Sequence, residues 1–157
     1  MNKTSYQFLI CGAGIVGLSV AKALLAKGAH SILVIDKESE LGVHGSGRNS
    51  GVLHAGIYYP PDTLKAKFCL QGNREWKAFC KDANIPVLET GKVIVPTDKS
   101  ELETLHRLYR YGNDNGASVT LISDHEVSNY EPAAIAYKEA LWSEETAVVN
   151  PKSVLSA

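Results

Sequence analysis

The stretch YQFLICGAGIVGLSVAKALLAKG, residues 6–28, decides the fold. Its first six residues are mostly apolar and run into a glycine, which is typical of a short buried strand. From Ile15 onward apolar residues recur at three- and four-residue spacing, which predicts a helix, and Gly28 stands where a left-handed C-terminal cap belongs. Residues 31–36 (SILVID) predict a second strand. Two apolar strands joined by a helix indicate a βαβ unit with a parallel sheet, and therefore an α/β fold.

The turn between the first strand and the helix has the sequence GAGIVG, in G-x-G-x-x-G spacing. In this context Gly12 permits the tight turn, Gly14 lets the backbone approach a pyrophosphate, and Gly17 lets the helix pack on the strand. The backbone N–H groups and the dipole of the helix N-terminus then bind negative phosphates. The alternative is a glycine-rich turn in an unrelated α/β protein.

Asp36 ends the second strand, where a carboxylate can accept hydrogen bonds from ribose hydroxyls. Because an acidic residue there repels a 2′-phosphate, the sequence disfavours NADP and suits the adenosine ribose of FAD or NAD. We therefore predict a Rossmann-like unit. In this part of the chain the predicted cofactor-binding residues are Gly12, Gly14, Ile15, Val16, Gly17, Asp36 and Lys37.

The segment LGVHGSGRNSGVLHAGIYYPPD, residues 41–62, is too long and too rich in glycine for a simple connection, so we expect it to serve a site. Its small polar side chains suit hydrogen bonds to cofactor oxygens, its arginine can pair with phosphate, and its glycines permit close approach of the backbone. The alternative is a solvated polar loop. The residues predicted to contact the cofactor here are Ser46, Arg48, Asn49, Ser50, Gly51 and Val52.

A long helix is predicted next, capped by Asp62 or Thr63. We expect one stripe of this helix to be packed, and Gly72 within the stripe to mark the close approach of another backbone. The residues of the predicted stripe are Leu64, Phe68, Gly72, Trp76, Phe79, Cys80 and Ala83. The three cysteines, which form no C-x-x-C pair, are interpreted as reduced, buried, small apolar side chains: Cys11, Cys69 and Cys80.

Beyond Pro86 the pattern predicts a strand at residues 91–96, a helix from Asp98 to about Gly112, and a strand at residues 119–122. A short helix follows, for which Ser123 and Glu126 form a capping box. A further strand is predicted over residues 137–143.

The order of these elements suggests a division of the chain. We interpret residues 1–85 as part of a cofactor-binding domain and residues 86–150 as the start of an inserted α+β substrate-side domain. Asn150 and Pro151 are favoured at the start of a helix, which residues 151–157 begin. Because so short a helix is marginal alone, we expect the chain to be a fragment or a natural truncation.

The run from Gly45 to Lys67 resembles one stretch of the L-2-hydroxyglutarate oxidases and dehydrogenases, which belong to the D-amino-acid-oxidase (DAO) superfamily of flavoproteins. In that family R/H-N-S-G-V-hydrophobic-H-x-G-I-Y-Y precedes a proline-containing turn and L-K-A. Weaker similarity continues through GKVIVP, NYEP and ETAVVNPKSV, so it covers nearly the whole chain. The residues that fit the pattern are Arg48, Asn49, Ser50, Gly51, Val52, His54, Gly56, Ile57, Tyr58, Tyr59, Pro60, Leu64, Lys65 and Ala66.

The resemblance implies FAD as the cofactor and hydride transfer from C2 of a short 2-hydroxy dicarboxylate to flavin N5, giving 2-oxoglutarate. A base takes the hydroxyl proton, and the electrons then pass to oxygen or to a membrane quinone. Asn150 stands where the family usually has a carboxylate. Two alternatives stay open: a related amine or glycerol-3-phosphate oxidoreductase, and an inactive fragment, since the relatives are much longer.

The resemblance also places His54 close to the isoalloxazine ring, which makes it the candidate catalytic residue. Three interpretations stay open for it: a non-covalent role near the flavin, covalent attachment of the flavin, or a structural histidine bonded to backbone. Tyr58 and Tyr59 either flank the flavin or substrate or simply pack. The other histidines have no ligand spacing, so no metal site is predicted.

Composition narrows the class of protein further. Of 157 residues, 45% are hydrophobic and 21% charged, and the net charge of −1 comes without long runs of one sign, so we expect a folded protein and no nucleic-acid partner. No apolar stretch is long enough to span a bilayer, and the first residues do not resemble a secretory signal. We therefore expect a cytoplasmic location, with a peripheral position at the membrane if a quinone accepts the electrons.

Overall fold

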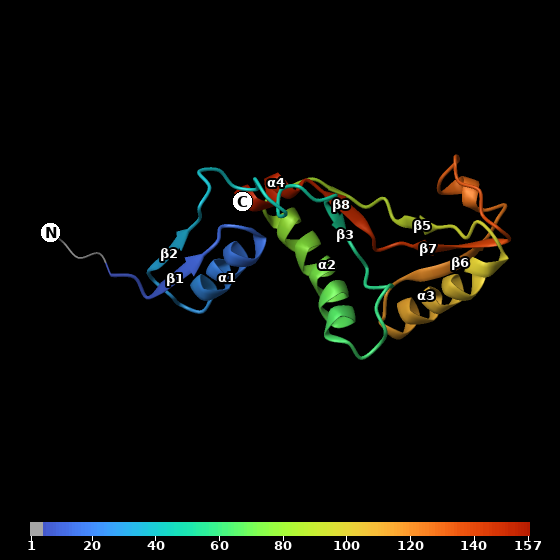
Figure 1. The fold of residues 1–157 in the computed structure, drawn as a ribbon, viewed down its shortest axis with the longest axis horizontal. Coiled ribbons are helices and arrows are strands. Elements are labelled where there is room, and N and C mark those ends of the chain that lie inside the picture. Colours follow the sequence, from blue (N-terminus) through green and yellow to red (C-terminus); the bar gives the residue numbers. More distant parts are fainter. Residues whose placement is uncertain (1–4) are drawn as a thin grey trace. The chain divides into compact units, whose positions relative to one another are not determined.

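The computed structural model describes residues 5–157, which form two compact units (Figure 1). The N-terminal unit comprises the residues up to Gly51 together with Asn150–Ala157, and the central unit comprises Val52–Val149. The predicted division of the chain into residues 1–85, 86–150 and 151–157 stays a prediction.

The N-terminal unit contains the βαβ arrangement that the sequence predicts. Strand β1 (Phe8–Cys11) pairs in parallel with β2 (Ile32–Ile35), and helix α1 (Ile15–Ala26) connects them. Gly28 has a φ of 90° directly after the helix, and the N–H groups of Gly28 and Ala29 donate to the carbonyls of Leu25 and Leu24. This pair of hydrogen bonds is the Schellman motif that ends a helix, so the predicted cap is confirmed.

Helix α4 (Pro151–Ser156) completes the N-terminal unit. The Asn150 side-chain oxygen accepts hydrogen bonds from the N–H groups of Lys152 and Ser153, at 2.9 and 3.3 Å, which confirms the predicted cap. Leu155 is buried, and its side chain lies against the loop at Gly42.

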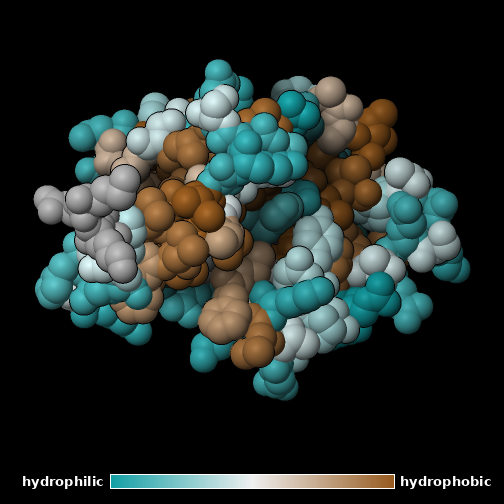
Figure 2. Space-filling model, turned by 60° about the vertical axis from the view of Figure 1, so that its left-hand side comes forward, coloured by the Kyte–Doolittle hydropathy of each residue, from teal (hydrophilic) through white to brown (hydrophobic). Residues whose placement is uncertain are grey.

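Apolar side chains of the βαβ arrangement are exposed to an unusual degree. Helix α1 has no buried residue, and Val16 on its first turn is 74% exposed. Apolar surface, drawn in brown, is also prominent on the face of the molecule seen in Figure 2. A helix that is apolar on most of its sides normally lies between other layers of a protein.

In the central unit, helix α2 (Leu64–Asp82) begins at Thr63, whose hydroxyl accepts a hydrogen bond from the Ala66 N–H at 3.2 Å. The predicted packed stripe is only partly correct, because Cys80 is buried but Leu64 and Phe68 are exposed. No described atom outside the helix's own backbone lies within 4 Å of a Cβ built at Gly72, so the predicted close approach of another backbone is wrong for residues 5–157. The buried residues of the helix are Ala66, Leu70, Asn73 and Cys80.

The central unit also contains two small antiparallel sheets. In the first, β8 (Ala147–Val149) lies between β3 (Val52–Leu53) and β4 (Val87–Leu88). In the second, β7 (Glu139–Ser143) lies between β5 (Lys92–Ile94) and β6 (Val119–Ser123). The strands of the second sheet were predicted, although β5 and β7 are shorter than expected, whereas the three strands of the first were not.

Helix α3 (Leu102–Asp114) packs on β6 and β7 (Figure 1), and a 3-10 turn, η1 (Lys99–Glu101), precedes it. Asp98, where the sequence predicted the helix to start, caps this turn by accepting from the N–H of Ser100. The helix contributes two leucines to the main hydrophobic core, whose buried residues are Ala55, Ile57, Leu70, Leu105, Leu108, Ala117 and Leu141.

The segment between β6 and β7 differs from its prediction. The Glu126 carboxylate accepts from the Ser123 N–H at 2.8 Å, as a capping box requires, but the Ser123 hydroxyl donates to the same carboxylate instead of accepting from the backbone. Only one 3-10 turn follows, η2 (Val127–Asn129).

The cysteines are free, as expected, but they are not all buried. Cys80 is fully buried, Cys69 is half-buried, and Cys11 is exposed, so the interpretation of Cys11 as a buried side chain is wrong.

Candidate functional site

The glycine loop has the geometry that its spacing predicts. Gly12 has a φ of 111°, which residues other than glycine rarely adopt, and its N–H donates to the Ile35 carbonyl at 2.7 Å. A Cβ at Gly17 would collide with the carbonyl oxygen of Gly12 and would lie 3.3 Å from Cγ2 of Ile10. Gly17 is therefore the residue that lets α1 pack on the turn and on β1.

The N-terminus of α1 has hydrogen-bond donors to spare. Its N-cap is Gly14, which has no side chain to accept from the helix, and the first turn contains no acidic residue. The Ser46 hydroxyl accepts from the Ile15 N–H at 3.1 Å, while no side chain within residues 5–157 accepts from the N–H groups of Val16 or Gly17. Free amides and the positive end of a helix dipole fit a pyrophosphate group.

Ser46 connects the second predicted segment to the glycine loop. Its Oγ lies 3.0 Å from the position of a Cβ at Gly14, so these two residues are in close contact. The loop is tight farther along as well, because a Cβ at Gly47 would collide with the carbonyl of Gly42. The structure therefore brings together Gly14, Ile15 and Ser46, which the sequence placed at one site.

Asp36 is bound to the same loop. Its Oδ2 accepts from the Ala13 N–H at 2.7 Å and its Oδ1 from the Glu38 N–H at 2.9 Å. These backbone donors, Glu38 first and Ala13 second, lower the pKa of the Asp36 carboxyl below its ordinary value, so it is ionised at neutral pH. Each carboxylate oxygen can accept a further hydrogen bond, which leaves capacity for a ribose hydroxyl.

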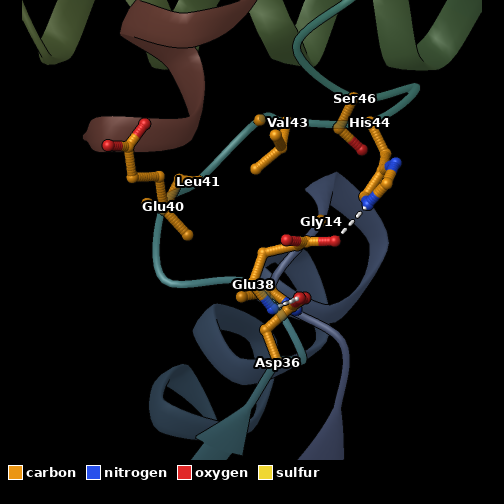
Figure 3. Close-up of a pocket in the computed structure, with 10 residues that line it drawn as sticks. Gly14, Asp36, Glu38, Glu40, Leu41, Val43, His44 and Ser46 are labelled. Carbon is orange, nitrogen blue, oxygen red and sulfur yellow. Dashed lines mark hydrogen bonds and ion pairs between the residues drawn. The ribbon is translucent and has the colours of Figure 1, made fainter.

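A pocket opens between the glycine loop, the end of β2 and residues 38–46, and Figure 3 shows the side chains that line it. Besides Asp36, it contains Glu38, whose carboxylate is 2.7 Å from Nε2 of His44, and Glu40. Three carboxylates disfavour a phosphate but suit the hydroxyls of a ribose. Lys37 is not among the lining residues, and its side chain is exposed and 3.6 Å from Glu38.

Asn49 orders the loop around itself. Its amide nitrogen donates to the carbonyls of Gly45 and Ser46, at 3.0 and 2.9 Å, and its side-chain oxygen accepts from the Gly51 N–H at 2.9 Å. Both amide hydrogens are used, so Asn49 shapes the segment that presents Ser46. Arg48 and Ser50 are exposed, and Gly51 is buried with a φ of 69°.

Val52 and His54 belong to the central unit, in and directly after β3. The His54 carbonyl accepts from the Cys69 thiol at 3.4 Å. The His54 side chain is exposed, but partial desolvation by its neighbours, and secondarily the positive charge of Lys92, lower the pKa of its imidazole and favour the neutral form at pH 7. A neutral imidazole has one nitrogen able to accept a proton.

Lys92 is a functional candidate that the sequence interpretation missed. Its ammonium donates to the Tyr58 hydroxyl at 2.6 Å and lies 4.6 Å from the centre of the Tyr58 ring. The motif GKVIVP contains this lysine, but only the fold shows that it meets the tyrosine after His54. Tyr59 has a looser contact, with Lys65 Nζ 5.8 Å from its ring centre.

Comparison with known proteins identifies the class of protein that this fold and loop define. Residues 7–157 match the DAO family, described as FAD dependent oxidoreductase. The chain therefore belongs to the DAO family of FAD-dependent oxidoreductases, and the family description supports the prediction of FAD over NAD.

Curated relatives agree with the resemblance seen in the sequence. The chain is 41% identical over 133 residues to the mitochondrial L-2-hydroxyglutarate dehydrogenase of Homo sapiens, a match that covers 83% of this chain and 29% of that protein. It is 40% identical over 147 residues to the protein of the same name from Caenorhabditis briggsae, covering 92% of this chain and 34% of that protein. The chain thus spans about a third of the length of these relatives.

Solved structures share the fold. An FAD-bound L-alpha-glycerophosphate oxidase from Mycoplasma pneumoniae superposes with a TM-score of 0.85 and 26% identity, over 95% of this chain and 40% of that one. Glycine oxidase from Geobacillus kaustophilus gives a TM-score of 0.84 with 20% identity, over 96% of this chain and 42% of that one. None of the described helices is long and apolar enough to cross a membrane.

Proposed function

We propose that this chain contributes the dinucleotide-binding part of an FAD-dependent oxidoreductase that oxidises L-2-hydroxyglutarate to 2-oxoglutarate. The observation that carries the proposal is the run from Arg48 to Tyr59, which resembles the L-2-hydroxyglutarate family, together with about 40% identity to dehydrogenases of that name. The chain spans about a third of the length of those relatives.

The residues of the N-terminal unit fit FAD. The free amides of Val16 and Gly17, at the N-terminus of α1, would hold the pyrophosphate, and Asp36 would accept hydrogen bonds from the adenosine ribose. Ser46 fixes the loop by accepting from the Ile15 N–H. FAD, when bound, supplies the two-electron acceptor for oxidation of the substrate.

The central unit contributes the candidate base. Partial desolvation and the charge of Lys92 favour the neutral form of His54, whose free nitrogen can take the proton of the substrate hydroxyl as C2 is oxidised. A non-covalent role of this kind needs no bond between histidine and flavin. Covalent attachment is tested separately: flavin that stays with acid-precipitated protein would establish it, and complete release would dispose of it.

The same fold occurs in the glycerophosphate oxidase, so oxidation of glycerol 3-phosphate is the competing activity, followed by oxidation of amines. We favour the hydroxy acid because identity to the hydroxyglutarate dehydrogenases is about 40%, against 26% for the glycerophosphate oxidase. A cytoplasmic location and transfer of electrons to oxygen or a quinone are further parts of the proposal.

The test is anaerobic reduction of the FAD-loaded protein by a panel of substrates. L-2-hydroxyglutarate should bleach the visible flavin band, and D-2-hydroxyglutarate, glycerol 3-phosphate, sarcosine and D-alanine should not. Bleaching by glycerol 3-phosphate or an amine alone would establish the competing activity. Protein that takes up no FAD would support the inactive fragment.

A further inference from the structure

Lys92 is an unusual residue for its position. It begins β5, a short strand that otherwise contains only apolar residues, and it is half-buried. None of the ion pairs formed within residues 5–157 involves it, so its positive charge has no carboxylate partner there. A partly buried cation without a counter-ion is costly, and the cost is offset when an anion binds.

The backbone under Lys92 is held firmly. Gly91, the preceding residue, has a φ of 63°, and a Cβ there would collide with the ring of Trp142. The Gly91 N–H donates to the Thr146 carbonyl at 2.9 Å, and Lys92 stands opposite buried Ser143 in the pairing of β5 with β7. The lysine side chain therefore extends from a fixed point.

Tyr58 is held just as firmly from the other side. The Asn115 amide nitrogen donates to the carbonyls of Gly56 and Tyr59, at 3.1 and 2.9 Å, and so clamps the turn on both sides of Tyr58. Ile57, next to it, is 2% exposed and belongs to the main core. The Tyr58 side chain itself is exposed to solvent, so a ligand can reach its hydroxyl.

The hydrogen-bond donors that remain free on Lys92 and Tyr58 match a carboxylate. An ammonium group has three hydrogens, of which one goes to the Tyr58 oxygen and two remain. Because that oxygen accepts from lysine, the phenol hydrogen is also free to donate. Lys92 Nζ and the Tyr58 hydroxyl, 2.6 Å apart, thus both have hydrogen-bond donors available to a ligand, and the Lys92 charge also lowers the pKa of His54.

We propose that Lys92 and Tyr58 form a carboxylate-binding corner that holds one acid group of the substrate and thereby determines specificity for organic acids. Its link to 2-hydroxy dicarboxylates rests on the proposed function. The lysine binds the carboxylate by charge and by hydrogen bonds, and the tyrosine orients it through its hydroxyl. Fixing the acid group at this corner positions the substrate hydroxyl relative to His54.

The test is a titration of the ¹⁵N-labelled protein with glutarate, followed through the amide resonances of residues 56–59 and 91–93. Glutarate should shift these resonances, and the neutral analogue glutaramide should not. Lys92→Gln should weaken glutarate binding by at least about tenfold, as loss of a charge-assisted hydrogen bond requires, and Tyr58→Phe by about fivefold. Lys92→Arg keeps the charge and should retain binding, so it separates loss of charge from loss of fold.

The matched control is Lys138→Gln. Lys138 also lies over a tyrosine ring, with Nζ 5.6 Å from the centre of Tyr137, but on the turn before β7 and with no role in the proposed corner. Equal glutarate affinity in Lys92→Gln and Lys138→Gln would overturn the proposal, and so would shifts with glutaramide as large as those with glutarate.

Failure of this proposal is distinguishable from failure of the proposed function. Glutarate binding that depends on Lys92, in a protein that does not oxidise L-2-hydroxyglutarate, supports the corner and refutes the substrate. Oxidation of L-2-hydroxyglutarate with the same KM in Lys92→Gln and the wild type refutes the corner and supports the proposed function.

Discussion

Replacing Gly17 by alanine is the sharpest perturbation of the cofactor loop. The added Cβ would collide with the Gly12 carbonyl oxygen and would lie 3.1 Å from the Gly12 carbonyl carbon and 3.3 Å from Cγ2 of Ile10. Two of these three atoms are backbone, so relief requires α1 to move away from the turn. Overpacking of this kind costs about 1–3 kcal/mol, of which the better helix propensity of alanine returns up to about 1 kcal/mol.

The loss of FAD affinity should exceed the loss of folding stability, because the atoms that move belong to the loop proposed to bind the pyrophosphate. We expect Gly17→Ala to lower FAD affinity by at least about tenfold, equivalent to about 1.4 kcal/mol, measured by quenching of flavin fluorescence on titration. Urea unfolding gives the stability change in the same samples.

Gly72→Ala is the matched control, since Gly72 is also helical and a Cβ there meets no atom within 4 Å. It should leave FAD affinity unchanged and stabilise the protein by about 1 kcal/mol. Equal FAD affinity in Gly17→Ala and Gly72→Ala would refute the assignment of the glycine loop as the pyrophosphate site.

Two other predictions concern single side chains. The pKa of Asp36 is lower in the folded protein than its ordinary value of 3.8. This carboxylate therefore stabilises the fold above pH 3.8, and the stabilisation is lost as the pH falls through the lowered pKa. A ¹³C titration of the carboxyl carbon that gave a pKa of 3.8 or more would contradict this prediction. Asn115→Ala removes the donor to the carbonyls of Gly56 and Tyr59 and should lower the free energy of unfolding, measured with urea, by about 1–3 kcal/mol. Asn113→Ala loses one exposed hydrogen bond to the Tyr109 carbonyl and should lower it by less than about 1 kcal/mol. Equal losses in the two variants would show that Asn115 does not clamp the turn.

Local patterns carried much of the sequence prediction. The βαβ unit was predicted from three local signals: the helical periodicity of residues 15–26, the left-handed cap at Gly28 and the tight turn at Gly12. The structure confirms the helix, the cap and the turn. The caps at Thr63, Asp98 and Asn150 are local in the same sense, because each side chain bonds to an amide two or three residues ahead.

The features that could not be predicted depend on partners far away in the sequence. The buried face of α2 is set by Asn73, whose amide donates to the carbonyls of Leu53 and Glu145, at 2.8 and 3.0 Å. Nothing near Asn73 in the sequence indicates those partners. The large apolar side chains of Leu64 and Phe68 were therefore predicted to lie on the packed face, although both are exposed. The strands β3, β4 and β8 have only two or three residues each, which is too few for an alternating pattern.

The candidate site was predicted in the same uneven way. Ser46 was expected near the cofactor, and its bond to the Ile15 N–H brings it to the glycine loop. Asn49 matched a family pattern, yet its side chain is occupied with its own loop. Lys92 lies 34 positions beyond Tyr58, so their hydrogen bond was visible only in the fold.

The central claim, that the chain serves an FAD-dependent oxidation of L-2-hydroxyglutarate, is tested most directly by stopped-flow reduction of the FAD-loaded protein without oxygen. L-2-hydroxyglutarate should bleach the visible flavin band, and substrate with deuterium at C2 should do so more slowly, because the C2–H bond breaks as the flavin is reduced. A flavin band that L-2-hydroxyglutarate leaves unchanged, in protein that has bound FAD, would contradict the claim.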